Sequence, residues 1–192
     1  MQNESTTLSI DQRFQLLKKL LDAGIRNLEI GAYVSPKWVP QMAGTEQLVK
    51  KYHQSVSALQ QKKINASVLV PNDEGMHKAI ETGIKEIAVF ISSTETFSQK
   101  NINCSIAESL MRVKSVMTLA KKNKIKVRGY LSVCFGCPYE GKVSEAKVVE
   151  LAQKLYKMGC YEVSIGDTIG IANPIQVERL FKKLKKVIPT TK

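Results

Sequence analysis

Residues 66–91 read ASVLVPNDEGMHKAIETGIKEIAVFI, and this stretch decides the fold class. It contains two short apolar runs, Ala66–Val70 and Glu86–Ile91, each typical of a buried strand. A short helical segment begins after Pro71 and ends at Gly83. A strand, a helix and a second strand in succession form a crossover connection, which joins parallel strands.

The same alternation of strands and helices continues along the rest of the chain. Three more strands are expected, at Asn27–Gly31, Val127–Val133 and Tyr161–Gly166. Three capping sequences each indicate the start of a helix. In each, a Ser or Asn and a Glu or Gln three residues later can satisfy each other's backbone donors. They are Ser9–Gln12, Ser105–Glu108 and Asn173–Gln176. Other helices are expected to end near Gln61 and to span Ser144–Gly159. Alternation without tight hairpins indicates an α/β protein with a parallel sheet.

Two nucleotide-binding motifs help to choose between the common arrangements of a parallel sheet. Neither G-x-G-x-x-G nor G-x-x-x-x-G-K-[ST] occurs, so the common nucleotide motifs do not support an open doubly wound sheet. The other common solution is a β/α barrel, with its chemistry at the carboxyl ends of the strands. A full barrel has roughly 250 residues and about eight strands. With 192 residues and five expected strands, we expect one domain over residues 1–192 that forms an incomplete TIM-type barrel.

Composition limits the compartment and the partners. The chain is 43% hydrophobic, and no apolar run approaches the ~20 residues that span a membrane. The first residues lack the profile of a secretory signal, so we expect a cytoplasmic protein without a membrane partner. The net charge of +12 concentrates in Lys121–Lys126 and Lys182–Lys186. These runs indicate either solvated helix faces or attraction for a polyanion, such as nucleic acid or a phosphorylated cofactor. Aromatic residues are only 6% and do not interleave with them, so nucleic acid is not an expected partner.

Cys134 and Cys137 have the C-x-x-C spacing of a redox dithiol or of half a zinc site. A zinc site would need a second pair or histidines, and the only histidines are His53 and His77. A redox dithiol usually lies at the start of a helix, whereas Pro138–Gly141 predicts a turn. The four cysteines of the chain do not make a disulfide scaffold and fit a reducing compartment.

Polar residues interrupt the apolar strands at Glu29, Arg128 and Ser164, and Asp167 follows the last strand. A buried carboxylate costs roughly several kcal/mol unless it is paired. One interpretation is therefore a structural ion pair inside the barrel, for instance Glu29 with Arg128. The other is a ligand site at the strand ends. Four neighbouring glycines would let a ligand approach the backbone: Gly31, Gly129, Gly166 and Gly170.

Five longer motifs identify a family. They are Val34–Met42, Lys100–Ser105, Gly136–Gly141, Gly159–Glu162 and Gly166–Gly170. In this order they resemble the 3-hydroxy-3-methylglutaryl-CoA lyase family, and the resemblance covers essentially the whole chain. It implies a β/α barrel and explains Cys137 as part of a loop after a strand.

The resemblance also implies a reaction and its requirements. The family cleaves 3-hydroxy-3-methylglutaryl-CoA to acetyl-CoA and acetoacetate, in leucine degradation and ketone-body formation. A base removes the proton of the tertiary hydroxyl, the carbon–carbon bond breaks, and the enolate is protonated. A divalent ion, Mg²⁺ or Mn²⁺, holds substrate oxygens. An acyl-CoA partner is therefore expected, and a homodimer for the intact enzyme.

Site residues follow from positions that match the family. Glu29 matches its active-site glutamate and Asp167 a pocket carboxylate, so catalytic roles are implied for both. Substrate-binding roles are implied for four further residues: Asn101, Arg128, Ser164 and Thr168. Asn101 and Arg128 match positions that approach CoA, where arginine suits phosphate.

The resemblance further implies a partial chain. Met1–Glu4 resembles a segment that follows the family's catalytic arginine and aspartate metal ligand, and its remaining metal ligands and catalytic cysteine would follow Lys192. We therefore expect no metal ligand in this chain, no activity from it alone, and the absence of the first, seventh and eighth strands. Two alternatives stay open. One is a non-catalytic remnant that binds CoA or intact subunits; the other is a condensing enzyme like isopropylmalate or homocitrate synthase, which fits less well at Ser35–Trp38 and Gly136–Glu140.

Overall fold

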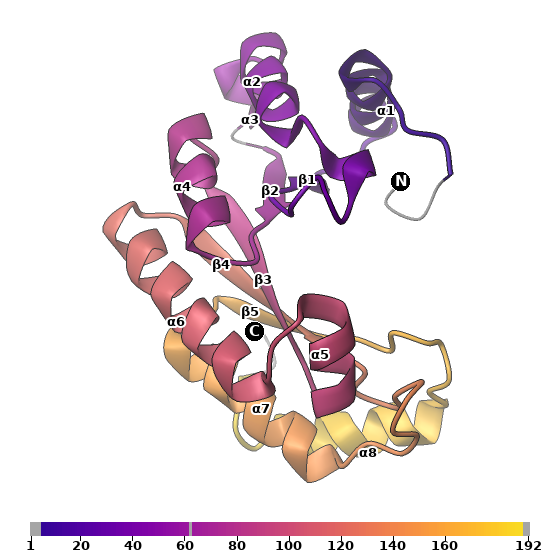
Figure 1. The fold of residues 1–192 in the computed structure, drawn as a ribbon. Helices are drawn as coiled ribbons and strands as arrows, with labels where there is room; N and C mark the ends of the chain where they lie inside the picture. The colour runs from indigo at the N-terminus through magenta and orange to yellow at the C-terminus, as the bar shows by residue number, and fades with distance from the viewer. Residues whose placement is uncertain (1–4, 62, 190–192) are drawn as a thin grey trace. The chain divides into compact units, whose positions relative to one another are not determined.

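The computed structural model describes residues 5–61 and 63–189, so the segment Met1–Glu4 lies outside the described residues. The chain divides into two compact units (Figure 1). The first holds the residues up to Ala88 together with Lys122–Ile125. The second holds Val89–Lys121 and the residues from Lys126 onward.

The first unit alternates helices with parallel strands. In chain order it contains α1 (Ile10–Asp22), β1 (Asn27–Ala32), the 3-10 helix η1 (Pro40–Met42), α2 (Thr45–Ser55), α3 (Ala58–Gln61), β2 (Asn65–Leu69), α4 (Asp73–Thr82) and the start of β3 (Glu86–Ser92). β2 pairs in parallel with β1 on one side and with β3 on the other. α2 packs against β1, α1 and α4, and it buries Leu48 and Val49 completely.

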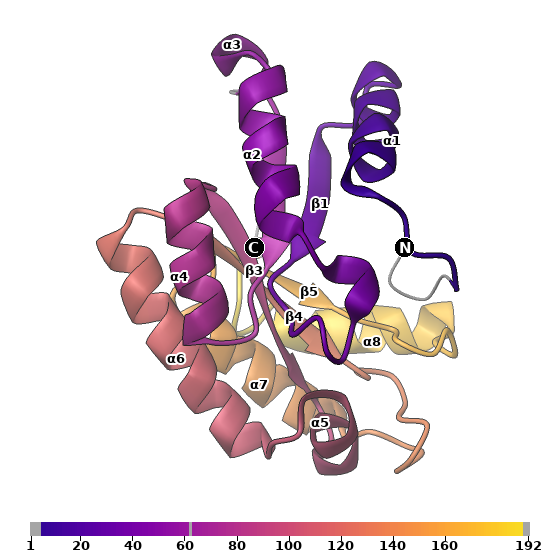
Figure 2. The same cartoon turned by 45° about the horizontal axis from the view of Figure 1, so that its top comes forward.

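The second unit continues the same pattern. It contains the end of β3, then α5 (Glu95–Ile102), α6 (Ile106–Lys122), β4 (Lys126–Ser132), α7 (Glu145–Met158), β5 (Glu162–Ile165) and α8 (Pro174–Leu184). β4 and β5 pair in parallel, and α7 covers both strands while contacting α8. Figures 1 and 2 show α6 and α7 running alongside each other. Leu151 and Leu155 of α7 form the centre of this core, with no exposed surface.

All three predicted capping sequences form their reciprocal hydrogen bonds. The distances between side chain and backbone are 2.9 and 3.2 Å for Ser9 with Gln12, 2.7 and 3.1 Å for Ser105 with Glu108, and 2.9 Å in both directions for Asn173 with Gln176. These predictions are confirmed because capping depends on residues that are close in sequence.

Two local predictions need correction. The helix expected to run to Gln61 is broken after Ser55, because Val56 takes an extended backbone and turns its side chain into the core. α5 was not predicted at all. Its only buried residue is Ser98, so the segment lacks the apolar periodicity that marks a packed helix.

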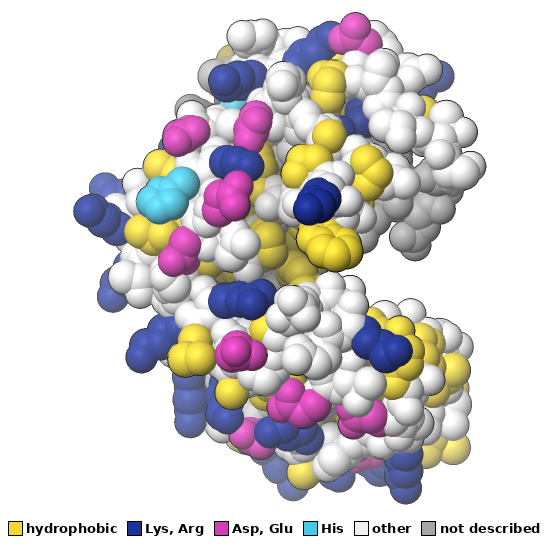
Figure 3. All heavy atoms as spheres, in the orientation of Figure 1, with side chains coloured by type: hydrophobic (Ala, Val, Ile, Leu, Met, Phe, Trp, Pro, Cys, Tyr) yellow, Lys and Arg dark blue, Asp and Glu magenta, His cyan; other side chains and the backbone are white. Residues whose placement is uncertain are grey.

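Charges of both signs mix on part of the surface. Figure 3 shows Lys and Arg side chains scattered over one face with Asp and Glu among them. Several lysines form ion pairs along their own helix, such as Lys78 with Glu74 and Lys154 with Glu150. This pattern favours solvated helix faces as the reason for the net charge. Within the described residues, no helix is long and apolar enough to cross a membrane.

Candidate functional site

The carboxyl ends of β3, β4 and β5 are joined by backbone hydrogen bonds. The Ser93 amide, just after β3, donates to the Ser132 carbonyl at 3.1 Å. The Cys134 amide, just after β4, donates to the Gly166 carbonyl at 3.0 Å, and the Gly166 amide donates to Leu131 at 2.8 Å. The loops that follow the three strands therefore begin side by side, at the end where parallel β/α folds place their chemistry.

Polar side chains share one face of β4 and β5. The parallel register places Arg128 opposite Glu162 and Tyr130 opposite Ser164. Because strand residues alternate between faces, the intervening residues of β4 are the ones buried against α7. Both strands thus present a polar row on the face that α7 does not cover.

Arg128 lies toward the amino end of that row. Its guanidinium donates to Glu162 Oε1 at 2.7 Å and lies 5.4 Å from the Tyr130 ring. The two charged side chains are 36% and 39% exposed, so the pair contributes about 1 kcal/mol or less. A structural ion pair is therefore present at Arg128 with Glu162, a partner that the sequence did not indicate. A substrate-binding role for Arg128 stays a prediction.

Asp167 organises the loop that follows β5. Its carboxylate accepts hydrogen bonds from the Ile171 amide at 3.1 Å and from the Ala172 amide at 2.9 Å. Its own carbonyl accepts from the Gly170 amide at 3.2 Å. These contacts close the segment into a turn and fix the direction of the carboxylate, whose remaining lone pairs can accept from a ligand.

Thr168 holds a strained residue at the end of β4. Val133 has a φ of 54°, in the left-handed region, and its side chain is fully buried. This conformation costs a residue with a Cβ about 1–2 kcal/mol. The Thr168 Oγ1 accepts the Val133 amide at 2.8 Å and so stabilises the strained backbone. Strain of this kind tends to occur at functional sites.

Replacing Thr168 by valine is expected to lower the free energy of unfolding by about 1–2 kcal/mol, because the buried Val133 amide loses its acceptor. Urea unfolding measures the loss, and hydrogen exchange at the Val133 amide locates it. Thr118→Val is the matched control, since the exposed Thr118 hydroxyl donates only to Lys114 in its own helix. Equal losses for the two variants would contradict the assigned role.

The other predicted site residues lie on different elements. Ser164 lies in β5, half-buried, close in sequence to Asp167 and Thr168. Asn101 is exposed in the last turn of α5, in the second unit. Glu29 is exposed in β1, in the first unit, where the pairing with β2 shifts register between Glu29 and Gly31. Such a shift interrupts the regular pairing of the two strands at this point.

Cys134 and Cys160 are not activated thiols. All four cysteines are free and buried. Burial raises the pKa of Cys134 to about 11 and that of Cys160 to about 12. The Cys137 sulfur accepts a hydrogen bond from Thr94 Oγ1 at 3.2 Å. Redox chemistry needs a thiolate, so burial of Cys134 argues against a C-x-x-C redox function.

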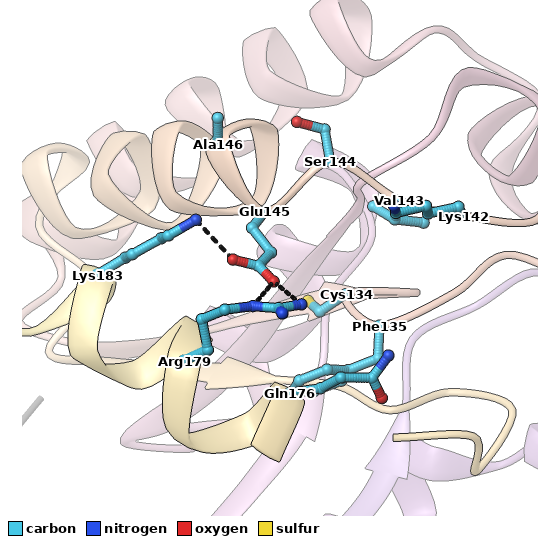
Figure 4. Close-up of a pocket in the computed structure, with 10 residues that line it drawn as sticks. All are labelled: Cys134, Phe135, Lys142, Val143, Ser144, Glu145, Ala146, Gln176, Arg179 and Lys183. Carbon is cyan, nitrogen blue, oxygen red and sulfur yellow. Dashed lines mark hydrogen bonds and ion pairs between the residues drawn. The ribbon is translucent and has the colours of Figure 1, made fainter. Parts of the chain in front are cut away.

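A cavity of about 530 Å³ opens between the loop after β4 and α8 (Figure 4). Glu145, the first residue of α7, accepts from Arg179 Nε at 2.6 Å and lies 2.7 Å from Lys183 Nζ, both on α8. Lys183 and then Arg179 hold the pKa of Glu145 below its usual value. The two cations are thus engaged in joining α7 to α8. The predicted site residues do not line this cavity.

Tyr130 and Glu162 complete the polar row, although sequence reasoning did not select them. The polar and apolar alternation of Lys126–Ser132 is the signal that could have found Tyr130. Among residues 5–61 and 63–189, no group of three or more His, Cys, Asp or Glu side chains could hold a metal ion.

Parallel strands alternating with helices, with polar side chains at the strand ends, define an α/β protein of the TIM-barrel class. Residues 1–192 match the HMGL-like family model. The chain belongs to the HMGL-like family.

Individual relatives agree with this assignment. The chain is 46% identical over 174 residues to the mitochondrial hydroxymethylglutaryl-CoA lyase of Rattus norvegicus, covering 91% of this chain and 52% of the relative. It is 42% identical over 191 residues to the Bos taurus enzyme, covering 100% and 57%. It therefore spans somewhat more than half the length of these relatives.

Solved structures confirm the fold class, an incomplete TIM-type β/α barrel. The hydroxymethylglutaryl-CoA lyase of Pseudomonas aeruginosa has a TM-score of 0.90 at 41% identity, covering 98% of this chain and 61% of that one. An HMG-CoA lyase of Acinetobacter baumannii, solved in complex with coenzyme A and 3-methylmalate, has a TM-score of 0.89 at 29% identity, covering 98% and 59%.

Proposed function

We propose that the protein to which these residues belong cleaves 3-hydroxy-3-methylglutaryl-CoA to acetyl-CoA and acetoacetate. The observation that carries this proposal is the match to a hydroxymethylglutaryl-CoA lyase over 98% of the chain, at 41% identity and a TM-score of 0.90. A fold alone supports many activities, whereas a match that combines the fold with this level of identity over nearly the whole chain supports the same activity more strongly.

The proposal assigns roles to six residues. Glu29 and Asp167 take catalytic roles, and Ser164 and Thr168 bind the acyl part of the substrate. The Thr168 hydroxyl uses a lone pair on Val133 but keeps its proton for donation to a substrate oxygen. Asn101 and Arg128 are assigned to binding of the CoA part.

The requirements of the reaction form part of the same proposal. Mg²⁺ or Mn²⁺ would hold substrate oxygens in the intact enzyme, an acyl-CoA is the ligand, and the intact enzyme is a homodimer. A cytoplasmic location stays a prediction. The relatives include both mitochondrial and cytoplasmic lyases, so they do not decide between the two compartments.

Acetyl-CoA release from 3-hydroxy-3-methylglutaryl-CoA tests the proposal. The purified 192-residue chain is assayed with Mn²⁺ or with EDTA, and its binding of coenzyme A is measured by calorimetry. We expect coenzyme A to bind, and we expect no release from this chain alone, because the resemblance places the metal ligands outside these residues.

Each outcome separates the alternatives. Ser164→Ala is expected to leave coenzyme A binding unchanged, and Asn101→Ala is expected to weaken it about tenfold. This pair of results would support the assigned division between acyl contacts and CoA contacts. EDTA-sensitive release by the chain alone would support the activity but contradict the assignment of the metal ligands. A folded chain that binds neither coenzyme A nor the substrate would contradict the proposed function.

A further inference from the structure

The segment from Cys137 to Gly141 is a closed loop. The Cys137 amide donates to the Gly141 carbonyl at 2.8 Å, and the Gly141 amide donates back to Cys137 at 2.9 Å. Gly141 has a φ of 69°, which favours glycine at the point where the loop closes. The loop is therefore a rigid platform, and Tyr139 and Glu140 project from it as exposed side chains.

This loop caps α5. Thr94 occupies the N-cap position of α5, but its hydroxyl donates to Cys137 Sγ at 3.2 Å and caps no backbone group of its own helix. The Glu140 carboxylate supplies the missing acceptor, since it accepts the Thr96 amide at 2.7 Å. A carboxylate at a helix N-terminus also interacts favourably with the helix dipole.

A second set of contacts runs along the helix toward its other end. The Tyr139 ring lies 6.1 Å from the Phe97 ring, centroid to centroid. The Lys100 ammonium lies 4.7 Å from the centre of the Tyr139 ring, within the range of a cation–π contact. Lys100 precedes Asn101, so the loop contacts α5 from its first turn to the residue beside the predicted CoA contact.

Further hydrogen bonds link α5 to α6. The Glu95 carboxylate accepts the Ile106 amide at 3.0 Å, and the Arg112 guanidinium donates to the Ile102 carbonyl, in the last turn of α5, at 3.2 Å. Ser98 is the only buried residue of the helix. Because an eight-residue helix is not stable alone, the position of α5 depends on these polar contacts and on the loop.

We infer that Glu140 is a positioning residue for substrate binding: by capping α5 it holds Asn101 where the CoA part of an acyl-CoA binds. This inference rests on the proposed function. It assigns one role to two motifs that are separate in sequence, Lys100–Ser105 and Gly136–Gly141. The loop supplies the cap, and the helix presents the ligand contact.

Hydrogen exchange tests the cap without any ligand. In the full chain with Glu140→Ala, the amides of α5 are expected to exchange about fivefold faster, as loss of an ordinary helix cap predicts. Glu140→Gln retains a carbonyl oxygen and is expected to restore most of the protection. Glu150→Ala is the matched control, because it removes the same charge from α7, where Glu150 pairs with Lys154. Unchanged exchange in Glu140→Ala would overturn the inference.

Coenzyme A affinity tests the consequence. Glu140→Ala is expected to weaken coenzyme A binding about fivefold, and Glu140→Gln is expected to weaken it less than twofold. In an Asn101→Ala background, Glu140→Ala is expected to have no further effect on binding, because Asn101 is the contact that Glu140 positions. A general loss of structure would instead give independent losses in the two backgrounds, and that result would overturn the role. If the unsubstituted chain binds no coenzyme A, the proposed function and the link to Asn101 fail, while the exchange result still decides whether Glu140 holds α5.

Discussion

Replacing Gly31 by alanine is expected to lower the free energy of unfolding by about 2 kcal/mol, because β1 and α2 are too close for a methyl group. A Cβ built on Gly31 would lie 2.6 Å from Thr45 Cγ2 and 2.8 Å from Thr45 Oγ1. Thr45 cannot turn away easily, because its hydroxyl lies 2.9 Å from the Met42 carbonyl and 3.0 Å from the Ala32 carbonyl. Urea unfolding of the variant measures the loss.

A double-mutant cycle with Thr45→Ala identifies the cause. Removing the Thr45 side chain beyond Cβ eliminates both of the closest contacts, so Gly31→Ala is expected to cost less than about 1 kcal/mol in that background. Additive losses would show that the close approach to Thr45 is not the reason for glycine.

Features encoded by neighbouring residues could be predicted from the sequence. The Asn72 side chain accepts the Gly75 amide at 3.0 Å at the start of α4, and Gly83 ends that helix with a φ of 74°. The five strands lie within a residue or so of their expected positions. Short apolar runs and capping residues determine these elements locally, so a single sequence is sufficient to locate them.

Contacts between distant residues could not be predicted in the same way. Glu140 caps α5 through an interaction that spans 44 residues, and nothing in either segment indicates the other. Arg128 had several carboxylates as possible partners, and only the register of β4 against β5 selects Glu162. The clustering of Ser164, Asp167 and Thr168 was predictable because the three lie within five residues of chain at one strand end.

Packing offers a second explanation for two of the glycines. Gly31 and Gly129 were interpreted as points where a ligand approaches the backbone. At both, an added Cβ would meet a helix side chain, which is Thr45 of α2 for Gly31 and Leu155 of α7 for Gly129. Close packing between a strand and its covering helix therefore accounts for glycine at these positions, and a ligand is not needed to explain them.

Replacing Leu155 by alanine is expected to produce the largest loss of stability, about 3 kcal/mol, because the side chain is fully buried between α7 and β4. Thermal or urea unfolding measures it. Leu16→Ala is a suitable control, since Leu16 is also a helical leucine but is 39% exposed, and it should cost less than about 1 kcal/mol. Similar losses for the two variants would contradict the central position of Leu155.

The cavity left by Leu155→Ala should accept the methyl group that Gly129 cannot accommodate in the original chain. A Cβ on Gly129 would lie 3.1 Å from Leu155 Cδ1 and 3.2 Å from Cys160 Sγ, so Gly129→Ala alone is expected to cost about 1 kcal/mol. Leu155→Ala removes the first of these contacts, and the double variant should be more stable than the sum of the single losses predicts, by about 1 kcal/mol. Since Arg128 and Tyr130 lie on the opposite face of β4, the rescue should also leave the ion pair with Glu162 in place. Additive losses would mean that β4 and α7 do not meet at Gly129 as tightly as the distances require.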